Sequence, residues 1–106
     1  MATEFIEVIV TFATVEDAEA VARDIIERKM GSCSQIAGPM ASVYRWKGIV
    51  ESASEFELRI KTKASLFDRL SQYIREVHPY DVPQIIAFPI DYISESYAAW
   101  IENSVL

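Results

Sequence analysis

The 106-residue sequence contains one cysteine, Cys33, and one histidine, His78. A single cysteine cannot form a disulfide within the chain, which suits a reducing compartment. Basic residues are few, with 10 Lys and Arg against 16 Asp and Glu, and the net charge is −6. This balance argues against a nucleic-acid partner, because phosphate contacts need clustered positive charge.

Long apolar runs are also missing, and none approaches the roughly 18 residues of a membrane-spanning helix. The N-terminal MATEFIEVIV has no basic start and no cleavage-site pattern. We therefore expect a cytoplasmic protein without a membrane partner. The length predicts a single domain over residues 1–106, since two halves would each be too small to hold a core.

The first half of the sequence predicts a strand, a helix and a long hairpin. Residues 5–13 are β-branched and aromatic, and Thr14 is placed to cap a helix that Gly31 ends in a left-handed conformation. Gly38-Pro39 predicts an irregularity or bulge in the next strand. Residues 48–54 are expected to form the turn, and the returning strand alternates through 56–61.

The second half predicts a helix, a strand and a final helix. Ser65 is expected to cap the second helix, whose buried face runs to Val77 and which Pro79 stops. Residues 84–90 form a strand that is too apolar to be exposed, and Ser94 can cap the last helix. The order β-α-β-β-α-β plus a terminal helix predicts an α+β, ferredoxin-like split βαβ fold, with an antiparallel sheet and helices on one face.

The other face of such a sheet is left bare. Ile9, Tyr44 and Trp46 suggest that it carries apolar groups. These groups need a cover, either the terminal helix or another subunit. We expect oligomerisation by sheet packing.

His78 allows two interpretations. A histidine at the C-terminus of a helix can simply interact with the last carbonyl groups. A metal site needs more ligands, and the nearest carboxylate is Asp81. Cys33 is a core residue, a soft metal ligand or, if the fold brings it to His78, half of a dyad. Glu51, Glu55 and Glu57 are interpreted as a solvated face.

Four segments carry a resemblance to a known family: SCSQI (32–36), SVYRWKGIV (42–50), ELRIKTK (57–63) and HPYDVPQIIAFPI (78–90). They resemble the CutA family of divalent-cation tolerance proteins in order and spacing over nearly the whole chain. The resemblance implies a homotrimer whose hairpins reach neighbouring subunits, with no established reaction and no required cofactor. It also implies tolerance of divalent metals, copper most often.

The resemblance further implies a cleft near the subunit junctions. Its residues here are Gln35, Trp46, Lys61, Tyr80 and Asp81, with His78 as the metal ligand or polar anchor. The leading hypothesis is a trimer that binds a divalent metal or a small ligand there. The alternative is a trimeric signalling or scaffold protein that resembles the PII-type transducers and acts through protein partners.

The chain departs from the family pattern at four positions. Gln35 and Gln84 stand where the family usually has Asn and Glu. Phe12 and Val77 stand where members thought to bind copper have Cys and a second His. Of that three-ligand set only His78 is present, which argues against tight copper binding by the same set.

Overall fold

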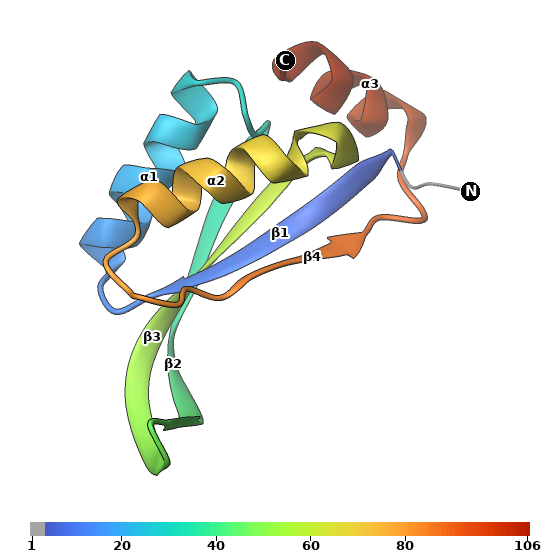
Figure 1. Cartoon of the computed structure of the whole chain (residues 1–106). Helices are drawn as coiled ribbons and strands as arrows, with labels where there is room; N and C mark the ends of the chain where they lie inside the picture. The colour runs from blue at the N-terminus through green and yellow to red at the C-terminus, as the bar shows by residue number, and fades with distance from the viewer. Residues whose placement is uncertain (1–3) are drawn as a thin grey trace.

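The computed structural model describes residues 4–106. Its elements are, in order, β1 (Phe5–Phe12), α1 (Val15–Glu27), β2 (Cys33–Trp46), β3 (Ile49–Lys63), a 3₁₀ turn (Ala64–Leu66), α2 (Phe67–Val77), β4 (Ile85–Pro89) and α3 (Glu95–Ser104). The strands form one antiparallel sheet in the order β2-β3-β1-β4. Helices α1 and α2 cover one side of it (Figure 1). The predicted ferredoxin-like arrangement is confirmed.

The core lies between the sheet and these two helices. Val8, Val10 and Phe12 of β1 point to this side and are fully buried, as the alternation of side chains along a strand requires. The helices contribute their own buried stripes, including Ile25 of α1 and Ile74 of α2. Every core-facing residue of β1 thus has a helix above it.

Helix α1 begins as predicted and ends differently. The Thr14 hydroxyl accepts a hydrogen bond from the Asp17 backbone N–H at 3.1 Å. The left-handed residue after the helix is Lys29, with φ 59°, so the prediction for Gly31 was wrong. Gly31 is needed for another reason, because a Cβ there would lie 2.7 Å from Cγ2 of Ile60.

Helix α2 corrects two predictions and confirms one. Ser65 is not its cap, because the chain enters the helix through the 3₁₀ turn and no side chain caps the first turn. Val77 is 43% exposed rather than buried. The helix does end before Pro79, where His78 has already turned to extended backbone (φ −73°, ψ 135°). The predicted cap of α3 is also present, with the Ser94 hydroxyl accepting from Tyr97 N–H.

The hairpin of β2 and β3 is longer than predicted. The register shifts between Ala37 and Met40, which confirms the irregularity at Gly38-Pro39. The turn is only Lys47-Gly48, both with positive φ (50° and 81°), as tight hairpins with primed turns require. Residues 49–54 are therefore strand and not turn.

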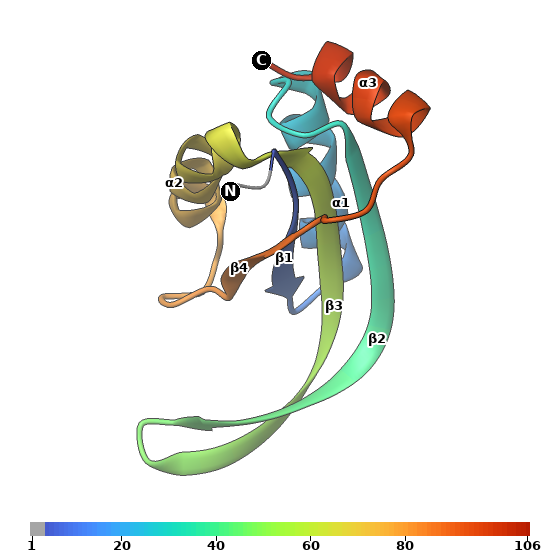
Figure 2. The same cartoon turned by 90° about the vertical axis from the view of Figure 1, so that its right-hand side faces the viewer.

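Beyond the register shift the hairpin projects away from the rest of the sheet (Figure 2). We call residues 40–55 the arm and the rest of the described chain the body.

The sheet face opposite α1 and α2 is only partly covered. Ile86 and Phe88 of β4 are 43% and 53% exposed, so the expectation of a buried strand was wrong. The reason is that β4 is an edge strand with a helix above one side only. Helix α3 lies at one end of this face, and burial, with a contribution from Cys33, raises the pKa of Tyr97. Among the described residues, no helix is long and apolar enough to cross a membrane.

Candidate ligand cleft

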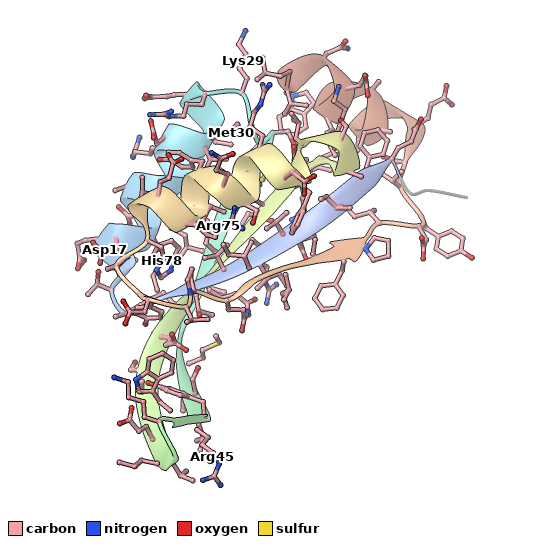
Figure 3. All side chains as sticks on the ribbon, viewed as in Figure 1. Asp17, Lys29, Met30, Arg45, Arg75 and His78 are labelled. Carbon is pink, nitrogen blue, oxygen red and sulfur yellow. The ribbon has the colours of Figure 1, made fainter. Side chains whose placement is uncertain are left out.

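His78 lies where the body meets the arm (Figure 3). Both of its ring nitrogens take part in hydrogen bonds. Nε2 is 2.8 Å from the carbonyl oxygen of Thr11, and Nδ1 accepts the Tyr80 backbone N–H at 3.1 Å. Since Nδ1 is an acceptor, the proton belongs on Nε2, which donates to Thr11. The ring also stacks on Phe12 with centroids 4.4 Å apart. This geometry ties the end of α2 to the end of β1.

The environment of His78 favours the neutral ring. Burial lowers its pKa, an effect that the hydrogen bond to Thr11 and the charges of Asp17 and Glu55 oppose only in part. A metal ion at Nδ1 would have to displace the Tyr80 N–H. In residues 4–106, no group of three or more His, Cys, Asp or Glu side chains is placed to hold a metal ion. Metal binding through His78 stays a prediction, and this displacement is its structural requirement.

Beside His78, a cleft of about 600 Å³ lies between the arm and the loop after α2. Three of the predicted site residues line it: Trp46 from the arm, and Tyr80 and Asp81 from the loop. The other lining residues are Thr11, Ser42, Val43, Tyr44, Glu51, Glu55, Val82 and Gln84. The loop from Pro79 to Pro83 and one side of the arm, up to Trp46 beside the turn, thus form its two walls.

Glu55 is the cleft residue that the sequence-based interpretation missed. It was expected on a solvated face, yet it is 8% exposed and accepts a hydrogen bond from the Tyr80 hydroxyl at 2.9 Å. Burial, and then this bond to Glu55, raise the pKa of Tyr80 to about 12, so the hydroxyl keeps its proton. The only sequence signal for Glu55 is the grouping of acidic residues near the hairpin, and that pattern does not reveal which of them is buried.

Gln35 and Lys61 lie elsewhere in this subunit. They are on the open sheet face, where Lys61 Nζ contacts Gln35 Oε1 at 2.5 Å and Glu7 Oε2 at 3.0 Å. Neither residue lines the cleft. A cleft that contained all six predicted residues would need groups from more than one subunit.

Cys33 and His78 do not form a dyad within one chain. Cys33 is paired with Lys61, which is opposite Glu7 on β1, whereas His78 binds Thr11. Glu7 and Thr11 are four steps apart along β1, which corresponds to about 13 Å at roughly 3.3 Å per residue. This distance excludes proton transfer between the two side chains within one subunit.

The fold places the chain among ferredoxin-like α+β proteins, here with an extended hairpin and a cleft beside it. The structure of CutA1 from Oryza sativa superposes with a TM-score of 0.94 at 38% identity, covering 98% of this chain and 95% of that one. Residues 6–104 match the family described as CutA1 divalent ion tolerance protein. The chain belongs to this family.

Relatives from an animal and a plant carry the name of the same family. The protein CutA homolog of Danio rerio is 40% identical over 97 residues, covering 92% of this chain and 65% of the relative. Protein CutA, chloroplastic, of Arabidopsis thaliana is 41% identical over 99 residues, covering 91% of this chain and 54% of the relative. The chain thus spans about half to two thirds of the length of these relatives. The family description names tolerance of divalent ions and no reaction.

Proposed function

We propose that this protein acts as a homotrimer that supports divalent-cation tolerance by holding a small ligand in the cleft between each arm and the loop after α2. The exposed apolar surface of the arm is the observation that carries the proposal. Val43, Ile49 and Val50 are 70%, 63% and 61% exposed. A protruding hairpin with such residues gains stability when a second surface covers them.

The open sheet face supplies a surface of suitable character for that contact. It combines the exposed Ile86 and Phe88 with the polar group of Gln35 and Lys61. Interfaces commonly join an apolar patch to a polar rim in this way. In the proposed trimer, Gln35 and Lys61 of one subunit approach the Trp46–Tyr80 cleft of another, which unites the predicted site residues.

The turn of the hairpin favours this role over the PII-like alternative. A signalling protein of that type needs a long flexible loop to engage its partners, whereas Lys47-Gly48 make a two-residue turn between paired strands. The cytoplasm stays the predicted compartment, although the Arabidopsis thaliana relative is named chloroplastic.

Sedimentation velocity at micromolar concentration tests the assembly. The wild type is expected at three times the 12.0 kDa of one chain, and Val43→Glu is expected to dissociate it, because the new charge would be buried at the contact. Ile26→Glu, at a 38% exposed position on α1 away from the arm, is the control and should remain trimeric. A wild-type monomer would refute the proposal.

A divalent metal, copper first, remains a predicted ligand at His78. Calorimetric titration of the metal-free protein with Cu²⁺ and Zn²⁺, compared with His78→Ala, tests it. Binding that is lost in the variant would support the role. Heat that is unchanged in the variant would remove His78 as a ligand.

A further inference from the structure

The loop after α2 is joined to the rest of the chain through one residue. Among the described residues, the segment 79–83, which we call the proline loop, takes part in two hydrogen bonds, and Tyr80 makes both of them. Its backbone N–H donates to His78 Nδ1 at 3.1 Å, and its hydroxyl donates to Glu55 Oε2 at 2.9 Å. No ion pair found in residues 4–106 involves the loop. Its position therefore depends on Tyr80.

Tyr80 connects the body to the arm. On the side of the body, its ring lies against the His78 ring with centroids 4.7 Å apart, and His78 in turn stacks on Phe12 of β1. On the side of the arm, Glu55 is paired with Met40, the first pair after the register shift. The hydroxyl thus reaches the arm where it leaves the sheet. Both anchors of Tyr80, His78 and Glu55, are 8% exposed, whereas Val82 in the loop is 71% exposed.

This construction favours movement of the proline loop as one piece. Pro79 and Pro83 each fix φ and hold the preceding residue in extended backbone, so the loop keeps its shape. Segments with few contacts open at a fraction of the global free energy of unfolding. Tyr80 and Val82 line the cleft together with Trp46 of the arm. Movement of the loop therefore changes the width of the cleft.

We propose that the proline loop is a movable wall of the ligand cleft and that Tyr80 is its latch. The wall is closed while the Tyr80 hydroxyl is bonded to Glu55, and it moves away from the arm to admit a ligand when that bond breaks. The inference rests on the proposed ligand cleft and specifies how access to it is controlled. It is compatible with the proposed trimer, because the latch lies within one chain and uses only one carboxylate oxygen of Glu55.

Amide hydrogen exchange, measured by NMR on the full chain, tests the latch at the N–H of residue 80, which is bonded to His78 while the loop is closed. In the wild type, low concentrations of urea should leave this exchange unchanged, because a local opening exposes little surface. The N–H of Val8, in the buried strand β1, should exchange faster in urea, since its exposure requires unfolding of the body. Tyr80→Phe keeps the ring and removes the hydroxyl. Exchange at residue 80 should then be at least about tenfold faster, as loss of a hydrogen bond to a charged group implies.

Substitutions of Glu55 test whether the two side chains act as a pair. Glu55→Ala should accelerate exchange at residue 80 about as much as Tyr80→Phe, and the double variant should exchange no faster than either single variant. Glu55→Gln keeps an acceptor for the hydroxyl and should retain most of the protection. Tyr92→Phe is the matched control, because Tyr92 is 96% exposed and lies outside the cleft, and it should leave residue 80 unchanged. Circular dichroism and sedimentation of each variant show whether fold and assembly are intact.

The outcomes separate this inference from the proposed function. Exchange at residue 80 that follows Val8 in urea would show that the loop opens only with the body. Unchanged exchange in Tyr80→Phe, or additive effects of Tyr80→Phe and Glu55→Ala, would show that the bond does not hold the loop. Each of these results overturns the latch and leaves the proposed trimer and its cleft standing. Dissociation of the trimer by Tyr80→Phe would place the hydroxyl at a subunit contact and also overturn the latch. A wild-type monomer would refute the proposed trimer, while the exchange measurements would still decide the latch within one chain.

Discussion

The body and the arm share the strands β2 and β3, and the apolar residues of β3 are buried in the body and exposed in the arm. In the body, Leu58 and Ile60 of β3 are fully buried under the helices. In the arm, Ile49 and Val50 of the same strand are 63% and 61% exposed. Local sequence does not cause this difference, because both segments are β-branched or aliphatic and both are paired with β2. The cause is that α1 and α2 cover the sheet of the body and do not extend over the arm (Figures 1 and 2).

This contrast indicates two sources of stability. The body has a core that is buried within one chain between the sheet and α1 and α2, although Ile86 and Phe88 on its open sheet face are exposed. The arm is held by its strand pairing and has apolar surface left over, and in the proposed trimer a neighbouring subunit would cover that surface. Substitutions in the two regions should therefore differ in size and in their dependence on protein concentration.

Leu58→Ala should produce the largest effect. It removes a fully buried side chain, and the cavity should lower the free energy of unfolding by about 2–5 kcal/mol. Chemical denaturation at two protein concentrations measures it. Val50→Ala in the arm is the counterpart, and its effect should be smaller and should change with concentration. Equal losses in both variants would show that the arm has a core of its own.

Gly31→Ala should have the next largest effect. The new Cβ would lie 2.7 Å from Ile60 Cγ2 and 2.9 Å from Ile25 Cγ2, and overpacking of this kind costs about 1–3 kcal/mol. Gly48→Ala is the comparison in the arm, where no atom lies within 4 Å and only the positive φ of 81° is unfavourable. A Gly31→Ala protein as stable as the wild type would mean that α1 can move away from β3.

The sequence predicted the body well and the cleft poorly, for physical reasons. Periodicity and caps such as Thr14 depend on neighbours in the chain, and they located the strands and α1. The burial of Glu55 depends on Tyr80, 25 residues away, and no local pattern contains that contact. The ends of α1 and of the hairpin turn were misplaced because Lys29 and Lys47 adopt positive φ, a conformation usually left to glycine. Gln35 and Lys61 do not line the cleft of this chain, and only the proposed trimer would bring them to the cleft of another subunit.

His78, at the junction between body and arm, should make a pH-dependent contribution to the free energy of unfolding. Burial lowers the pKa of His78 in the folded state, so the unfolded chain binds the proton more readily. The stabilisation is complete above the unfolded pKa of about 6.5 and is lost as the pH falls from there toward the lowered folded value. One proton gives a slope of at most about 1.4 kcal/mol per pH unit.

His78→Gln should remove this component. Urea denaturation of both proteins between pH 7.5 and 5 measures it as the difference between their pH profiles. The difference is needed because Asp17 and Glu55, the charged groups that act on His78, and other carboxylates titrate at the acidic end. Parallel profiles would contradict the assignment of a neutral, hydrogen-bonded His78.

The smallest predicted change is a gain in stability from a substitution in the turn of the arm. Lys47 holds φ 50° at the first position of the turn, where asparagine is favoured and a long side chain is not. Lys47→Asn should therefore raise the free energy of unfolding by about 0.5 kcal/mol, read from thermal unfolding. Lys47→Ala is the control, because it removes the ammonium group near Trp46 without supplying a residue suited to this conformation. A gain in both variants would assign the effect to charge, whereas a gain in Lys47→Asn alone would show that the backbone of the turn limits the stability of the arm.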